Sequence, residues 1–163
     1  MNNDIQFRLA DLNDIGQLIE LRILMQLEVN GFRKDQVTDE YKNQVKEYFL
    51  KAIPTKKYFS IVAELKTKII GTAGACFYEK PPSISGGIGL VGYVTNVYTN
   101  VDCRGKGIGT QMMAELNNLA IAIKADKLHL GATEDGLSIY KAVGFKEPRF
   151  VNLEMKFNYP GVK

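Results

Sequence analysis

Residues 104–109 read Arg-Gly-Lys-Gly-Ile-Gly and separate two segments of different character. The segment before them, 93–99, is rich in β-branched and aromatic residues, which are typical of a β-strand. In the segment after them, 108–123, apolar residues recur every three or four positions, and this spacing predicts a helix. The chain is therefore expected to pass from a strand to a helix through a turn that contains three glycines.

This glycine-rich turn has the chemistry of an anion-binding site. Glycine has no Cβ atom and leaves the neighbouring backbone N–H groups accessible, and the first N–H groups of a helix have no partner within the helix. Such groups bind anions, and Arg104 and Lys106 add positive charge at the same place. The turn therefore predicts a site for a phosphate or diphosphate group.

Two common phosphate-binding loops fit the sequence poorly. A P-loop requires Gly-Lys-Ser or Gly-Lys-Thr, and the chain contains neither. The dinucleotide fingerprint is G-x-G-x-x-G, whereas Gly105, Gly107 and Gly109 give G-x-G-x-G, followed by Thr110. Only about 55 residues follow Gly109, which leaves little chain to complete a doubly wound sheet. A nucleotide-binding oxidoreductase therefore stays as an alternative with less support.

A third pattern, Arg/Gln-x-x-Gly-x-Gly/Ala, is met by Arg104, Gly107 and Gly109. It resembles the diphosphate loop of the GNAT superfamily, the acyl-CoA-dependent N-acyltransferases. The resemblance implies that this loop and the start of the following helix hold the diphosphate of acetyl-CoA. The residues implied are Arg104, Gly105, Lys106, Gly107, Ile108, Gly109 and Thr110.

A second segment, 128–145, resembles the other signature of the superfamily. It has the order of a strand, a loop and a short helix, and its end, 139–145, reads Ile-Tyr, three residues and then Gly-Phe. Two positions depart from the usual pattern, since Thr133 stands where many members have Asn and Gly136 where Ala is common. The resemblance implies that Thr133 contacts the cofactor. It is residue-specific over 93–145 and covers most of the chain in layout.

The elements predicted along the chain form one domain, residues 1–163. The resemblance implies an α/β (α+β mixed) GNAT-like fold: a central, mostly antiparallel sheet with a splayed parallel strand pair, flanked by helices. Acyl-CoA would enter the splay, where a pantetheine arm can pair with free strand backbone. The expected elements are strands at 5–9, 58–65, 68–77, 93–99 and 127–131, helices over 12–29, 39–52, 108–123 and 135–143, a loop at 80–89 and a C-terminal hairpin.

The implied reaction is attack of an amine on the thioester of acetyl-CoA. The resemblance places the backbone of Val97, Tyr98 and Thr99 beside the pantetheine amides, and a backbone N–H near Val97 would stabilise the oxyanion. Tyr140 is the expected proton donor to the leaving thiolate, because a phenol donates at neutral pH. The other interpretation of Tyr140 is a core aromatic residue on a short helix.

The sequence does not identify a general base. Glu28, Glu79 and His129 are possible, since burial can raise the pKa of a carboxyl toward neutrality, and a chain of waters is an equal alternative. Cys103 could act as a nucleophile beside Arg104. The favoured interpretation of Cys103 is a turn residue near the diphosphate.

Composition restricts the partners. A net charge of +3 with scattered basic residues does not indicate nucleic-acid binding, and no apolar run approaches the roughly 20 residues of a membrane span. No signal peptide is recognisable at the N-terminus. Two cysteines without C-x-x-C spacing and one histidine predict no metal site, and they favour a reduced, cytoplasmic location.

The expected acceptor is a small-molecule amine, selected by the first two helices, the 80–89 loop and the C-terminal hairpin. The mixed charges of these regions do not single out an aminoglycoside, a polyamine, an amino acid or a protein N-terminus. A non-catalytic module that binds acyl-CoA is the alternative function. A homodimer is possible, with the edge of a strand at 151–157 as its interface.

Overall fold

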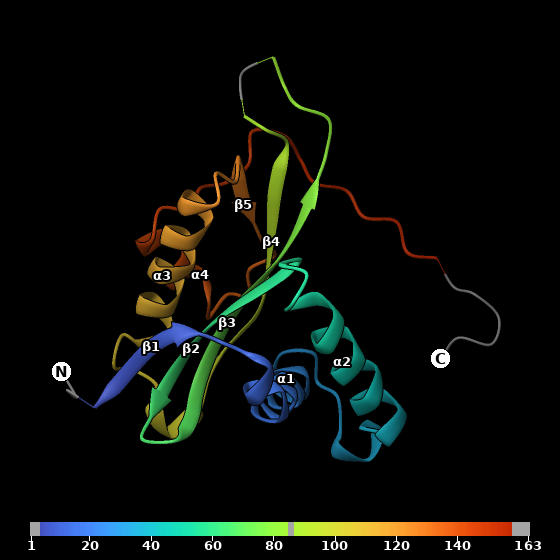
Figure 1. Ribbon diagram of the computed structural model, residues 1–163, viewed down its shortest axis with the longest axis vertical. Helices are drawn as coiled ribbons and strands as arrows, with labels where there is room; N and C mark the ends of the chain where they lie inside the picture. Colours follow the sequence, from blue (N-terminus) through green and yellow to red (C-terminus); the bar gives the residue numbers. More distant parts are fainter. Residues whose placement is uncertain (1–3, 85–86, 158–163) are drawn as a thin grey trace.

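The computed structural model describes residues 4–84 and 87–157. A five-stranded sheet in the order β1-β2-β3-β4-β5 lies at its centre. Helices α1 and α2 cover one face of the sheet, and α3 and α4 cover the other (Figure 1). No helix in these two ranges is long and apolar enough to span a bilayer.

The first four strands pair antiparallel with their neighbours, and β4 pairs parallel with β5. This arrangement confirms the expected mixed, mostly antiparallel sheet with one parallel pair. The strands are β1 (Ile5–Leu9), β2 (Tyr58–Leu65), β3 (Lys68–Glu79), β4 (Leu90–Thr99) and β5 (Lys127–His129).

The helices begin where capping residues predict. Asp11 and Asp14 form a capping box on a 3₁₀ turn that leads into α1, and the Thr38 hydroxyl accepts a hydrogen bond from the Tyr41 N–H at the start of α2. Such side-chain acceptors satisfy N–H groups that lack a partner within the helix. The helices are α1 (Ile15–Val29), α2 (Asp39–Ala52), α3 (Ile108–Ala122) and α4 (Leu137–Ala142).

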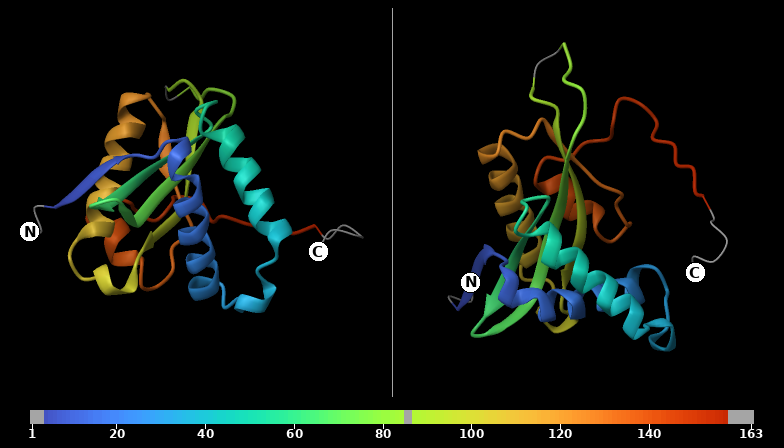
Figure 2. Two further views of the ribbon diagram at one scale, coloured as in Figure 1. Left: turned by 60° about the horizontal axis from the view of Figure 1, so that its bottom comes forward. Right: turned by 45° about the vertical axis from the view of Figure 1, so that its right-hand side comes forward.

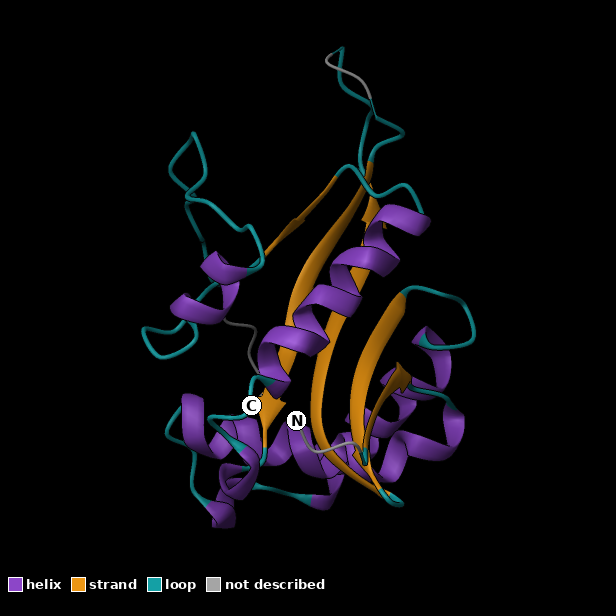
Figure 3. Cartoon of the chain, turned by 90° about the vertical axis from the view of Figure 1, so that its left-hand side faces the viewer, coloured by secondary structure: helices purple, strands orange, loops and turns teal. Residues whose placement is uncertain are grey.

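The core has two halves because successive strand residues point to opposite faces. On β2, Ile61 and Ala63 pack toward α3. Tyr58 and Val62 on the same strand belong to the cluster beneath α1 and α2. Figure 3 shows α3 lying across the sheet, with the other helical layer behind it.

The parallel strand pair separates at the centre of the molecule. β5 pairs with β4 only from Val91 to Tyr93, so the stretch 94–99 has no neighbouring strand on that side in the described part of the chain. Within this stretch β4 contains a bulge, because two residues, Asn96 and Val97, lie opposite Ala73 of β3. Asn96 adopts the left-handed conformation with φ 54°. The expected splay is therefore present.

The C-terminal hairpin is where the sequence-based expectation is wrong. Residues 151–157 form no strand, and their apolar side chains are exposed (Val151 86%, Leu153 93%). Figure 2 shows this segment leaving the sheet. Alternation predicts which side chains share a face but does not supply a partner strand, and β5, at three residues, offers little edge. The rest of the expected hairpin, 158–163, and residues 85–86 of the expected 80–89 loop lie outside the described residues.

Candidate active site

A cavity of about 580 Å³ lies where the splayed end of β4 meets the β4–α3 turn, the start of α3 and the start of α4. Three segments far apart in sequence contribute to it, 28–29 at the end of α1, 97–110 and 133–140. They bring together every predicted site residue except Lys106, whose exposed side chain is directed to the Asp102 carbonyl 3.5 Å away. The predicted residues in the lining are Val97, Tyr98, Thr99, Arg104, Gly105, Gly107, Ile108, Gly109, Thr110, Thr133 and Tyr140.

The floor of this cavity is the glycine turn. Gly105 and Gly107 have φ of 74° and 75°, a region that residues with a Cβ atom rarely adopt. A Cβ atom built at either position would meet nothing within 4 Å, so both face open space. Gly107 caps α3 without a side-chain hydrogen bond, and the first turn of α3 contains no acidic residue. The N–H groups and the positive end of the helix dipole are therefore available to an anion.

Arg104 lines the cavity, and three of its five N–H donors are already paired within the protein. Its Nε donates to the Thr99 carbonyl at 2.9 Å. Its two Nη atoms donate to the Glu28 carboxylate at 2.7 and 2.8 Å, and the guanidinium lies over the Tyr98 ring, 5.3 Å from its centroid. Arg104 thus joins the end of α1 to the glycine turn.

The ion pair between Arg104 and Glu28 affects whether Glu28 can act as a general base. The hydrogen bonds from Arg104 lower the pKa of the Glu28 carboxyl below its usual range. A base that acts near neutral pH needs its pKa raised, because it must take up a proton there. The geometry therefore favours Glu28 as an ion-pair partner of Arg104.

Tyr140 lies on α4 with its ring at the cavity, and burial raises the pKa of its hydroxyl. The hydroxyl makes no hydrogen bond with any described residue, so its proton is free for a ligand. Gly136 explains how the ring fits, because a Cβ atom there would lie 3.0 Å from the Tyr140 ring and 3.2 Å from the Thr133 hydroxyl. Thr133 in turn accepts a hydrogen bond from the Gly136 N–H at 3.2 Å.

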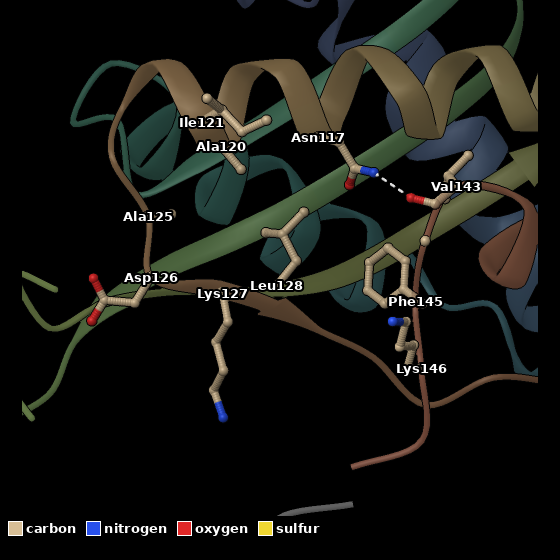
Figure 4. A pocket seen from close by; sticks show the side chains of 11 residues that line it. Asn117, Ala120, Ile121, Ala125, Asp126, Lys127, Leu128, Val143, Phe145 and Lys146 are labelled. Carbon is tan, nitrogen blue, oxygen red and sulfur yellow. Dashed lines mark hydrogen bonds between the residues drawn. The ribbon is translucent and has the colours of Figure 1, made fainter. Parts of the chain in front are cut away.

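A smaller cavity of about 380 Å³ lies between α3, β5 and the segment 143–146 that follows α4 (Figure 4), and its surroundings show how α4 is held. The Asn117 side chain on α3 donates to the Val143 carbonyl at 3.0 Å. The Phe145 ring lies beside Leu128 in the same view and makes an edge contact with Tyr140, with 6.0 Å between ring centroids. The Gly-Phe end of the motif therefore anchors the helix that presents Tyr140.

The structure does not bring the other two base candidates to the cavity. Glu79 pairs with Leu90 at the far end of β4, about 23 Å from Val97 at the usual rise per strand residue. The His129 Nε2 atom lies 3.0 Å from the Tyr78 hydroxyl, and burial lowers the pKa of the ring. Cys103 does line the cavity, directly before the glycine turn.

A second and larger cavity, of about 1010 Å³, lies between α1 and α2, the two helices expected to select the acceptor, but sequence reasoning did not single out Arg22 or Asn96. Arg22 of α1 lines it and donates a short hydrogen bond to the Asn96 side chain in the β4 bulge. Asn96 is buried (5% exposed) and donates to the Tyr58 hydroxyl at 3.0 Å. The signal in the sequence that could have pointed to these residues was Asn96, an asparagine in the middle of a predicted strand.

This chain is similar in sequence and in fold to known proteins. A family model described as the acetyltransferase (GNAT) domain matches residues 56–147. Glucosamine 6-phosphate N-acetyltransferase 1 of Dictyostelium discoideum is 26% identical over 147 residues, which cover 90% of this chain and 87% of that protein.

Among solved structures, a predicted acetyltransferase from Clostridium acetobutylicum, crystallised with acetyl-CoA, is 30% identical. It has a TM-score of 0.79, with 92% of this chain and 96% of that chain covered. An aminoglycoside acetyltransferase from an uncultured soil sample shares the fold alone, at 16% identity and a TM-score of 0.74 over 96% and 99% of the two chains. With its glycine turn, its splayed strands and these relatives, the chain belongs to the GNAT family and is an acyl-CoA-dependent acetyltransferase.

Proposed function

We propose that the protein transfers an acetyl group from acetyl-CoA to a primary amine of a small molecule, by direct attack of the amine on the thioester. The observation that supports this most is the single cavity that gathers the glycine turn, the free backbone of β4 and the Tyr140 hydroxyl. These groups have the chemistry needed for the diphosphate, the pantetheine amides and the leaving sulfur, respectively.

The β4–α3 turn has the role of holding the diphosphate through the N–H groups of 105–110. Val97 and Thr99 would pair with the pantetheine, because this part of β4 has no strand beside it. The bulge turns the backbone at Val97 away from the regular ladder, and its N–H is our choice for the oxyanion donor. Thr133, in the loop between β5 and α4, lines the cavity and would contribute a hydroxyl to the cofactor.

Tyr140 would protonate the thiolate of CoA as the tetrahedral intermediate collapses. Because burial raises the pKa of its phenol, the proton is retained at neutral pH and remains available for donation. A dedicated base is not required in this scheme. The attacking species is either the fraction of amine that is already deprotonated, or an amine whose proton passes through water to solvent. Glu28, Glu79 and His129 are each paired or distant.

The acceptor class is suggested by the relatives. The Dictyostelium relative is named for glucosamine 6-phosphate, and an amino sugar phosphate is therefore a first substrate to try. We propose a small amine of this kind, or an amino acid, over a polymeric acceptor. A homodimer stays a further proposal, to be checked by light scattering.

The experiment is a thiol-release assay with acetyl-CoA and a panel of amines, with the acetylated product identified by mass spectrometry. The proposal expects release of CoA that depends on the amine, and a product heavier by one acetyl group. Binding of acetyl-CoA without transfer to any amine in a broad panel would contradict it and favour a module that senses acyl-CoA.

A further inference from the structure

The cavity between α1 and α2 has a mixed lining, in which polar side chains stand among Ile23, Leu27, Phe32 and Val37. Its lining includes neutral hydrogen-bonding side chains, among them Gln26, Thr38 and Gln44. Figure 2 shows α1 and α2 side by side on one side of the sheet, with the segment that joins them turning back at their ends. Glu40 lines the same cavity, from the first turn of α2.

Arg22 is the charged group that singles this cavity out. Its half-buried side chain makes one short hydrogen bond to Asn96, yet no carboxylate of the described residues forms an ion pair with it. Arg8, Arg33 and Arg104 each have such a partner. A guanidinium has five N–H donors in a planar fork that matches a carboxylate or phosphate.

A second observation points to a ligand independently. The Tyr41 hydroxyl, on α2, is fully buried and has no hydrogen-bond partner in the described residues, although Tyr41 lines the cavity. Leaving a buried hydroxyl unsatisfied is costly. A rotation of the Tyr41 side chain on ligand binding would bring this hydroxyl to a ligand oxygen in the cavity and satisfy it.

The position of Arg22 connects this cavity to the reaction. Arg22 touches Asn96, which directly precedes Val97 in the β4 bulge. Val97 lines the acetyl-CoA cavity from the other face of the sheet. The β4 bulge therefore lies between Arg22 and the cavity proposed for acetyl-CoA.

We propose that this cavity binds the acceptor and that Arg22 recognises a carboxylate or phosphate group on it, with the Tyr41 hydroxyl as a second contact. The inference rests on the proposed acetyl transfer and specifies its substrate: an amine that also bears an anionic group. Arg22 and Tyr41 are specificity residues in this account and take no part in proton transfer.

The test uses pairs of amines that differ in the anionic group. Glucosamine 6-phosphate is compared with glucosamine, and L-phenylalanine with 2-phenylethylamine, so that phosphate and carboxylate are distinguished. The expected result is that the anionic member of one pair has the higher kcat/KM, by about 10- to 100-fold for a charge-assisted bond. Equal or better turnover of both neutral partners would overturn the proposal.

Variants assign the preference to Arg22. Arg22→Met is expected to remove it through a higher KM for the anionic acceptor, whereas Arg22→Lys retains part of it. Arg33→Met is the matched control, because Arg33 is exposed, already paired with Asp35 and absent from the cavity lining. A preference that survives in Arg22→Met would contradict the assignment.

Tyr41→Phe supplies a readout that a structural role would not give. Removing a hydroxyl that is buried without a partner should leave the melting temperature unchanged or higher. The KM for the anionic acceptor should rise at the same time. A lower melting temperature with an unchanged KM would overturn the ligand contact.

The same preparations are titrated with acetyl-CoA, which separates the two levels of the account. Normal acetyl-CoA binding together with no binding and no turnover of either anionic amine overturns the anion assignment alone. Loss of acetyl-CoA binding in the wild-type protein would instead defeat the proposed function.

Discussion

The two large cavities on either side of β4 are built from different parts of the chain. The cavity proposed for acetyl-CoA has much of its lining in one continuous segment, 97–110, which contains the glycine turn, the N-terminus of α3 and the free stretch of β4, and the rest comes from 28–29 and 133–140. The cavity between α1 and α2 is formed by side chains from successive turns of two helices and from their connection. A backbone site can accept any diphosphate-bearing cofactor of the right shape, whereas a side-chain site can change its ligand with a few substitutions.

The substitution with the largest expected effect is Tyr140→Phe, in the cavity proposed for acetyl-CoA. We expect kcat to fall by about 10²- to 10³-fold, the range for losing a general acid, with little change in the KM for acetyl-CoA. Tyr93→Phe is the control, since Tyr93 does not line the cavity, and it should leave kcat unchanged. If Tyr140→Phe raises the KM and spares kcat, the phenol is a binding group.

The glycine turn gives the next largest effect. Gly107→Ala should weaken acetyl-CoA binding by about 10-fold or more, because a methyl group would occupy the open space at the turn and strain a residue with positive φ. Gly31→Ala imposes similar strain at φ 66° with open space around it. Both variants should lose similar stability in thermal melts, and calorimetry should show weaker acetyl-CoA binding in Gly107→Ala alone. Equal affinities of the two variants for acetyl-CoA would show that the glycine turn is not part of the binding site.

A double-mutant cycle on Arg104 and Glu28 tests whether this side-chain ion pair contributes to acetyl-CoA binding in the cavity at the glycine turn. We expect Arg104→Ala and Glu28→Gln each to weaken acetyl-CoA binding by about two- to fivefold, the range for an exposed ion pair. The double variant should be no worse than either single variant, because the two side chains act as one link. If Arg104 binds phosphate directly, Arg104→Ala would lose far more and Glu28→Gln would bind more tightly.

The smallest expected effect is the pH dependence of this ion pair. The pKa of Glu28 is lowered in the folded protein from an ordinary value of 4.5, so the pair stabilises the fold above that pH. This contribution, at most about 1 kcal/mol for an exposed pair, is lost as the pH falls through the lowered pKa. Thermal melts between about pH 3 and pH 6 should show the wild type and Glu28→Gln converging at the acidic end. A constant difference across the range would contradict the assignment.

The contrast between the cavities also explains what the sequence could predict. The turn at 104–109 was recognisable because positive φ favours glycine, and a helix start follows at once. The pairing of Arg104 with Glu28 was not, because the residues are 76 positions apart and only the packing of α1 beside β4 brings them together. The contact between Arg22 and Asn96 has no pattern in the sequence for the same reason, because the two residues are far apart along the chain. The prediction for 151–157 failed for a different reason: its apolar and polar residues do alternate, but the described residues contain no partner strand for it.

Calorimetric titration of the wild-type protein with acetyl-CoA, CoA and NADH tests the central claim most directly. The account predicts that acetyl-CoA and CoA bind at a single site with micromolar affinity, because both have the diphosphate and the pantetheine, and that NADH gives no heat. Binding of NADH without CoA, or of neither, would contradict the assignment of the β4–α3 cavity to acetyl-CoA.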